Sequence, residues 1–304
     1  MAHIYVYSPS SAVRDKAAFR RGVKRLQAQG HEVEIDPAAL TSHMRFAGDD
    51  ATRIAAIGRA AASGADIALI SRGGYGLTRI LPGLPYKAIA KGIDAGTQFV
   101  GLSDFTAFNQ AVLAQTGRIT WQGPALGEDL GPEGEPDDIM FACFDDLLAE
   151  QGEGAGWQRP LAEAELQARV KDGVLWGGNL SVLVSLLGTP FFPQVNKGVL
   201  FLEDVGEHPY RIERMLTQLL HAGVLAQQKA IVLGQFSNYK LTPHDKGFKL
   251  ASVVDWLRAN VKVPVLTDLP FGHVPTKLCL PVGQKIDLVV EDRDALLLWA
   301  HADH

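Results

Sequence analysis

Ser103 is the residue of this chain best placed to act as a nucleophile. It lies in residues 101–106, sequence GLSDFT, where an apolar run stops and a helical pattern starts, so we expect a sharp turn between a strand and a helix. A serine on such a turn faces the positive end of the following helix, which suits attack on a carbonyl through an oxyanion. The match to G-x-S-x-G is partial, because Phe105 replaces the second glycine. The alternative is that Ser103 or Asp104 merely caps the helix.

A glycine-rich loop, residues 71–76 with sequence SRGGYG, follows the preceding apolar run. Its glycines allow backbone amides to approach a ligand closely. The loop matches neither G-x-G-x-x-G nor the G-K-[ST] ending of a P-loop, which disfavours nucleotide binding and leaves a plain tight turn as the alternative. Since Ser103 lies one strand further along, amides from one loop and the hydroxyl from the other could together form an oxyanion-hole arrangement.

The elements that position these two loops alternate between strand and helix. Right-handed crossovers place such strands in one parallel sheet, with the loops that follow them along a single edge. Ligands bind at that edge in open α/β sheets. The expected strands are residues 4–7, 31–35, 65–70 and 99–100, and the expected helices cover residues 18–26, 51–62 and the segment after residue 106.

Glycine, proline and acidic residues cluster between residues 131 and 156, which is typical of a domain boundary. We therefore predict one domain over residues 1–155 and a second over residues 156–304. In the second, residues 166–170 read as a strand, and the Asp172-Gly173 pair indicates a hairpin turn after it.

The second predicted domain holds two further candidates for chemistry. A strand over residues 199–202 runs into Glu203 and Asp204, which puts at least one carboxylate at a strand end; the alternative is a solvated loop acid. His273 lies in residues 270–275, sequence PFGHVP, and this rigid frame is a good mount for a general base. The alternative is an uninvolved loop histidine.

Bulk properties exclude several functional classes. The chain has 304 residues, 47% of them hydrophobic, and a net charge of -5 without any Lys/Arg run, which argues against a nucleic-acid binder. Cys143 and Cys279 match no metal spacing and are predicted to be buried thiols, and no HExxH or His/Cys cluster occurs, so we expect no metal and no cofactor. The sequence shows no signal peptide and no apolar run of 18 residues, so we expect no membrane partner and a cytoplasmic location.

Three groups of motifs are specific when taken together: RGGYG at residues 72–76 with GLSDFT at 101–106, FLED at 201–204 running into PYRI at 209–212, and PFGH at 270–273. In this combination the chain resembles the L,D-carboxypeptidase family of serine peptidases, the muramoyltetrapeptide carboxypeptidases. A branch of that family gives immunity to microcin-type peptide-nucleotide antibiotics. The resemblance covers nearly the whole chain.

The resemblance implies a Ser-Glu-His triad in which Ser103 is the nucleophile, Glu203 the orienting residue and His273 the base. Backbone amides near Gly74 and Asp104 would then hold the oxyanion. It further implies an amino-terminal α/β domain with a parallel sheet, like those of class I glutamine amidotransferases, and a carboxyl-terminal α/β domain built around a swivelling β-barrel. A homodimer is expected.

The function implied by the resemblance is hydrolysis of the L,D peptide bond that releases terminal D-alanine from murein tetrapeptides, for cytoplasmic cell-wall recycling. Two alternatives remain open at this point. One is an immunity-type hydrolase that cleaves an amide in a peptidyl-nucleotide antibiotic, and the other is a non-catalytic small-molecule binding protein. Arg72 is a candidate for binding a substrate carboxylate, and Leu102 stands where family members often carry an aromatic residue.

Overall fold

The chain forms two compact units in a computed structural model that describes residues 1–149 and 151–299. The first unit comprises Met1–Gly152, Gly188–Pro193 and Pro275–Gly283. The second comprises Glu153–Leu187, Gln194–Val274 and Gln284–His304. Two late segments of the chain therefore return to the first unit.

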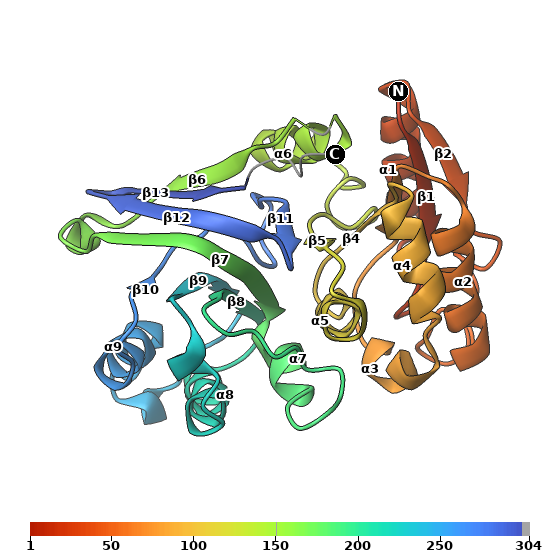
Figure 1. Cartoon of the computed structure of the whole chain (residues 1–304). Helices are drawn as coiled ribbons and strands as arrows, with labels where there is room; N and C mark the ends of the chain where they lie inside the picture. The colour runs from red at the N-terminus through yellow and green to blue at the C-terminus, as the bar shows by residue number, and fades with distance from the viewer. Residues whose placement is uncertain (150, 300–304) are drawn as a thin grey trace. The chain divides into compact units, whose positions relative to one another are not determined.

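A six-stranded sheet forms the centre of the first unit, in the order β11-β5-β4-β3-β1-β2 (Figure 1). β1 to β5 pair in parallel, whereas β11 pairs antiparallel with β5. The prediction of a parallel-sheet α/β unit is confirmed, with β11 as an antiparallel addition from a distant part of the sequence. The strands are β1 (His3–Tyr7), β2 (Glu32–Ile35), β3 (Ile67–Ile70), β4 (Gln98–Gly101), β5 (Thr120–Gln122) and β11 (Leu280–Val282).

Helices cover both faces of this sheet because its central strands are apolar on both sides; β3, for example, is buried at all four positions. α1 and α6 pack on the face that carries Ile4 and Val6. α2, α4 and α5 pack in a row on the other face, where Tyr7 and Phe99 meet edge to face. The helices are α1 (Lys16–Ala28), α2 (Asp50–Ala62), α3 (Leu77–Ile80), α4 (Tyr86–Asp94), α5 (Phe105–Thr116), α6 (Asp138–Leu148) and the 3-10 helix Leu81–Gly83.

The second unit has a seven-stranded mixed sheet in the order β10-β9-β8-β7-β12-β13-β6. β7 to β10 pair in parallel, and the remaining neighbours pair antiparallel. Helices α7, α8 and α9 pack in sequence beside the parallel half (Figure 1). The strands are β6 (Gly154–Gln158), β7 (Ala168–Asn179), β8 (Val199–Val205), β9 (Ala230–Ser237), β10 (Val265–Leu266), β12 (Lys285–Glu291) and β13 (Asp294–Leu298). The helices are α7 (Leu180–Ser185), α8 (Pro209–His221), α9 (Leu250–Asn260) and the 3-10 helices Leu161–Glu163, Leu225–Gln227 and Pro243–Asp245.

The α/β class of this unit is confirmed, but its described strands do not close into a barrel. β10 and β6 are the two edges of the sheet, and no backbone ladder joins them within residues 153–187, 194–274 and 284–299. Side chains bridge the edges instead: Trp157 Nε1 of β6 donates to the Thr267 carbonyl at 3.0 Å, and Thr267 Oγ1 donates to Glu163 Oε1 at 2.9 Å. The sheet therefore curls toward a barrel without completing it.

The hairpin predicted at Asp172-Gly173 is wrong, because β7 runs through both residues. Asp172 has φ +52°, and residues 171 and 172 lie opposite the single residue Asp287 of β12. The Asp172 N–H donates to Asp287 Oδ1 at 2.8 Å. An Asp-Gly pair satisfies the backbone of a β-bulge as well as that of a turn, so the local signal did not separate the two.

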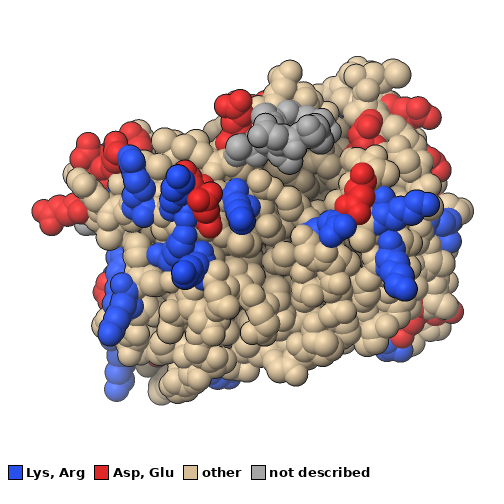
Figure 2. Space-filling model, in the orientation of Figure 1, with Lys and Arg blue, Asp and Glu red and all other residues tan. Residues whose placement is uncertain are grey.

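The described surface carries charges of both signs. On the face shown in Figure 2, basic and acidic side chains are interspersed, without a continuous basic surface among the residues drawn. No helix within residues 1–149 and 151–299 combines the length and apolar character needed to cross a membrane.

Candidate active site

Ser103 lies on a tight turn between β4, which ends at Gly101, and α5, which begins at Phe105. Its φ is +68°, a left-handed conformation that costs a non-glycine residue about 1–3 kcal/mol and that clusters at functional sites. A Cβ at Gly101 would lie 2.6 Å from the Phe105 ring. Phe105, which breaks the G-x-S-x-G pattern, therefore packs over a position that must be glycine.

The Asp104 side chain does not cap α5, so the helix-cap alternative is wrong for this residue. The side chain is 2% exposed, and its Oδ2 accepts hydrogen bonds from Ser10 Oγ at 2.7 Å and from the Leu77 N–H at 2.8 Å. Burial raises the pKa of the Asp104 carboxyl, and these hydrogen bonds partly offset the effect. Asp104 thus connects the turn that carries Ser103 to the loop after β1 and to the end of the glycine loop.

The glycine loop lies directly against Ser103. A methyl group at Gly73 would lie 2.7 Å from Ser103 Cβ and 3.1 Å from its Oγ. Further along the loop, Ser11 Oγ accepts from the Tyr75 N–H at 3.0 Å, and the fully buried Arg53 donates from Nη1 to the Gly76 carbonyl at 2.8 Å. The loop is therefore held from several sides, as a preorganised set of amide donors requires. That the Gly74 and Asp104 amides form an oxyanion hole stays a prediction.

Glu203 and His273, 70 residues apart in sequence, meet in the second unit. His273 Nδ1 lies 2.8 Å from Glu203 Oε2. Glu203 is fully buried in β8, whereas the His273 side chain is 20% exposed. The alternative of a solvated loop acid is therefore wrong, and the geometry allows the Glu203 carboxylate to orient the His273 imidazole.

Close backbone approaches hold His273 beside Glu203. A Cβ at Gly272, whose φ is +142°, would lie 2.8 Å from the Gln235 carbonyl oxygen and 3.1 Å from Glu203 Oε2. Ser237 Oγ, at the end of β9, donates to the His273 carbonyl at 3.3 Å. Glycine at position 272 therefore allows the loop to place the imidazole against the strand that carries Glu203.

Asn179 and Asp204 complete the surroundings of Glu203. Asn179 Nδ2 donates to Glu203 Oε1 at 3.1 Å and to Asp204 Oδ1 at 3.0 Å, while Asn179 Oδ1 caps α7 by accepting from the Val182 N–H at 3.1 Å. Burial raises the pKa of Asp204 from 3.8 to about 6, and the nearby Glu203 carboxylate adds to the shift. Both oxygens of Glu203 are thus engaged, one by the imidazole and one by a fixed amide.

Sequence reasoning missed Asn179 and the side-chain contacts of Asp104. The segment GGNL at residues 177–180 indicates only the start of a helix, and an N-cap asparagine is common there. The local sequence does not indicate the other contacts of Asn179, because its Nδ2 donates to Glu203 and Asp204 on the neighbouring strand β8. Ser10 likewise reaches Asp104 across 94 positions of sequence.

The predicted catalytic residues fall in different units: Ser103 in the first, Glu203 and His273 in the second. Arg72 lies in the first unit, one residue before Gly73, with its Nη1 donating to the Ala12 carbonyl at 3.2 Å. The triad as a whole stays a prediction.

The described part of the chain contains no cluster of metal ligands, and both of its cysteines are at least half-buried. No group of three or more His, Cys, Asp or Glu residues within residues 1–149 and 151–299 is arranged to hold a metal ion. Cys279 is buried, as predicted, whereas Cys143 of α6 is only half-buried and packs against the core cluster that contains Cys279. Burial raises the pKa of both thiols, which makes them poor nucleophiles.

Comparisons with known proteins cover most of the chain. Residues 4–123 match the LD-carboxypeptidase N-terminal domain and residues 172–288 match the LD-carboxypeptidase C-terminal domain. The probable murein peptide carboxypeptidase of Bacillus subtilis is 30% identical over 273 residues, which are 90% of this chain and 84% of that protein. The Microcin C7 self-immunity protein MccF of Escherichia coli is 27% identical over 253 residues, 73% of this chain and 70% of that protein. A crystal structure of muramoyltetrapeptide carboxypeptidase from Oxalobacter formigenes superposes with a TM-score of 0.87 at 35% identity, covering 98% of this chain and 100% of that one.

Proposed function

Because the chain belongs to the LD-carboxypeptidase family, we propose that it is a serine peptidase that hydrolyses the L,D peptide bond of murein tetrapeptides and releases terminal D-alanine. Several relatives carry names that refer to murein peptides or muramoyl tetrapeptides. The observation that supports catalysis most directly is the 2.8 Å contact between the buried Glu203 carboxylate and His273. A binding protein without chemistry has no need for this pair.

In the proposed reaction, His273 accepts the proton of the Ser103 hydroxyl while the serine oxygen attacks the carbonyl carbon of the scissile bond. Glu203 fixes the imidazole tautomer through Nδ1, so that Nε2 takes the proton, and stabilises the resulting imidazolium. The amides of Gly74 and Asp104 hold the negative oxygen of the tetrahedral intermediate. The imidazolium then gives its proton to the amine of D-alanine, which leaves. Water, deprotonated by His273, hydrolyses the acyl-Ser103 ester.

Incubation of the purified protein with L-Ala-γ-D-Glu-diaminopimelate-D-Ala, followed by mass spectrometry, tests this proposal. We expect the tripeptide and free D-alanine as the products. The matched control is Ser103→Ala, which should show a rate lower by about 10⁴-fold or more. An unchanged tetrapeptide after incubation with folded wild-type protein would refute the proposal.

The immunity-type hydrolase is the second candidate, because the microcin self-immunity protein MccF is a relative. Side-by-side assay of the tetrapeptide and of an aminoacyl sulfamoyl adenosine, in which the same serine would cleave an amide, separates the two functions. Preference for the nucleoside substrate would favour immunity. Labelling of Ser103 by a serine-directed fluorophosphonate would exclude the non-catalytic alternative, since an unactivated serine does not react.

The proposal includes a homodimer and a cytoplasmic location, both of which come from the sequence resemblance. Light scattering should give twice the chain mass of 32.8 kDa. Cell fractionation with an antibody against the native chain tests the compartment. A monomer at micromolar concentration, or recovery outside the cytoplasmic fraction, would contradict the respective part.

A further inference from the structure

A cavity of about 420 Å³ opens beside the glycine loop of the first unit. Its walls come from the start of α1, from the segment after β3 and from the loop over residues 127–133. Ser71 and Arg72 line it and directly precede Gly73, the residue in contact with Ser103. Because consecutive Cα atoms are about 3.8 Å apart, the cavity begins within one side-chain length of the candidate nucleophile.

Two of the charged residues of this cavity serve the fold. Asp15 Oδ1 caps α1 by accepting from the Ala17 and Ala18 N–H groups, each at 2.8 Å. Arg21 Nε donates to the carbonyls of Gly131 at 2.9 Å and Pro132 at 3.2 Å. Their charges are therefore committed to local structure.

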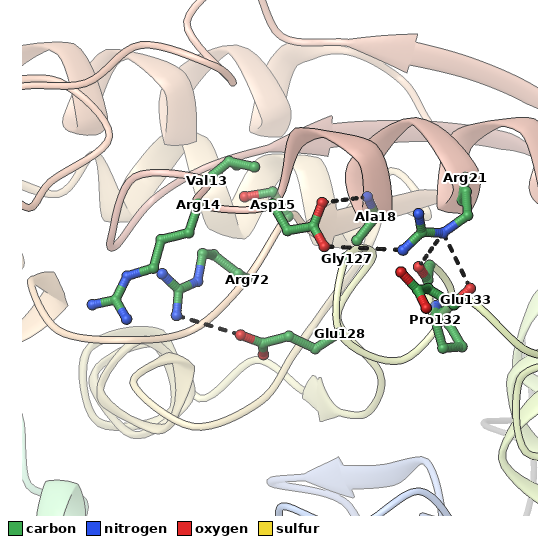
Figure 3. Close-up of a pocket in the computed structure, with 12 residues that line it drawn as sticks. Val13, Arg14, Asp15, Ala18, Arg21, Arg72, Gly127, Glu128, Pro132 and Glu133 are labelled. Atoms are coloured by element: carbon green, nitrogen blue, oxygen red, sulfur yellow. Dashed lines mark hydrogen bonds and ion pairs between the residues drawn. The ribbon is translucent and has the colours of Figure 1, made fainter.

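The remaining charged residues in the wall are two arginines and two glutamates: Arg14, Arg72, Glu128 and Glu133. In Figure 3 the side chains of Arg14 and Arg72 extend to the same end of the cavity, and Glu128 faces Arg72. Arg72 Nη2 lies 3.4 Å from Glu128 Oε1, and the Arg72 side chain is 16% exposed, against 52% for Glu128. A largely buried guanidinium therefore lies beside a more exposed carboxylate, and the formal charges of the four residues sum to zero.

Such a wall complements a group that carries both signs of charge. Guanidinium groups bind a carboxylate through paired, charge-assisted hydrogen bonds, and a carboxylate accepts from an ammonium. In the proposed reaction the attacked carbonyl belongs to a diamino acid. The side chain of diaminopimelate ends in an ammonium and a carboxylate on one carbon, about 5 Å from its α-carbon when extended.

Resting on the proposed function, we propose that this cavity binds the side chain of the residue whose carbonyl is attacked, and that Arg14 and Arg72 select diaminopimelate over lysine. The two arginines bind the side-chain carboxylate, and Glu128 binds the ammonium. A lysine side chain has the ammonium but no carboxylate, so it leaves both arginines without their ligand.

The test compares kcat/KM for two tetrapeptides that differ only in diaminopimelate or lysine at the third position. We expect wild type to favour the diaminopimelate peptide by about tenfold or more. Arg14→Gln and Arg72→Gln should each lower that preference by about fivefold or more, chiefly through KM for the diaminopimelate peptide. Glu128→Gln should weaken both peptides together, because both carry the ammonium. The matched control is Arg20→Gln, an exposed arginine of α1 outside the cavity wall, which should change neither rate.

Equal wild-type rates for the two peptides would overturn the inference while leaving the proposed peptidase function standing. An equal loss on both peptides in Arg14→Gln and Arg72→Gln would also overturn it, since a structural role predicts that pattern. Cleavage of neither peptide by wild type would refute the proposed function, and the inference with it. If Arg72→Gln fails to fold, the exposed Arg14→Gln variant decides.

Discussion

Gly73→Ala probes the contact between the glycine loop and the nucleophile with a single methyl group. The new Cβ would lie 2.7 Å from Ser103 Cβ and 3.2 Å from the Leu102 carbonyl oxygen. Unstrained carbon–carbon contacts lie at about 3.5–4.0 Å, so the loop and the serine must separate by about 1 Å. Gly73 is not among the residues with positive φ, so the strain comes from this contact alone.

A displacement of about 1 Å at a catalytic group costs about 10²-fold in rate. We therefore expect kcat for D-alanine release to fall by about 10²-fold in Gly73→Ala, with KM changed by less than about threefold because no substrate contact is removed. Overpacking should lower the free energy of unfolding by about 1–3 kcal/mol, which leaves the protein folded at 25 °C. The rate of fluorophosphonate labelling of Ser103 should fall in parallel and does not depend on the substrate.

The matched control is Gly58→Ala in α2, where the nearest atom to a new Cβ is Pro85 Cγ at 3.8 Å. It should leave kcat unchanged and raise the free energy of unfolding by about 0.5–1 kcal/mol, since alanine is the better helix former. If Gly73→Ala kept more than half of the wild-type kcat and labelling rate, the loop would not position the nucleophile, and the oxyanion role proposed for Gly74 would lose its basis.

Four further predictions follow from the site. Ser103→Gly should be as inactive as Ser103→Ala, but its free energy of unfolding in urea should be higher by about 1 kcal/mol, because glycine adopts φ +68° without strain. Equal free energies of unfolding for the two variants would contradict the inference that the backbone at residue 103 is strained. Asp104→Ala should lower kcat by about tenfold or more while the overall fold, measured by circular dichroism, stays, because it removes the oxygen that accepts from both Ser10 Oγ and the Leu77 N–H; an unchanged kcat would show that the carboxylate is not needed for positioning. The folded-state pKa of Asp204 is about 6, above the ordinary 3.8, so between these two pH values the folded protein holds a proton that the unfolded chain has lost. The contribution of Asp204 to the free energy of unfolding is therefore greatest below about pH 4 and falls by about 3 kcal/mol as the pH rises through 6. Denaturant titrations should show that this slope is absent in Asp204→Asn, and an identical slope would contradict the assignment. Exhaustive chelation should leave turnover unchanged, because no ligand cluster occurs in residues 1–149 and 151–299; loss restored by zinc would overturn this expectation.

The sequence by itself determined the elements of the first unit and the location of its two candidate functional loops. The apolar run of β3 and the helical spacing of apolar residues in α2 each favour one type of secondary structure. Because the strands are parallel, the crossovers bring the carboxyl ends of β3 and β4 to the same edge of the sheet. The candidate residues Ser103, Glu203 and His273 were likewise found from local motifs and family resemblance, because each lies in a short, unusual frame of glycine, proline or acidic residues.

Only the tertiary structure decided which side chains meet. The contacts of Glu203 with His273 and Asn179, and of Asp104 with Ser10, join residues that are 24 to 94 positions apart in sequence. A local sequence pattern does not indicate which distant residues come into contact. The Asp172-Gly173 bulge and the incomplete barrel were decided in the same way. Strand pairing and sheet curl depend on the partner strand, here β12 for the bulge and β6 for the edge, whereas turn chemistry is the same in either setting.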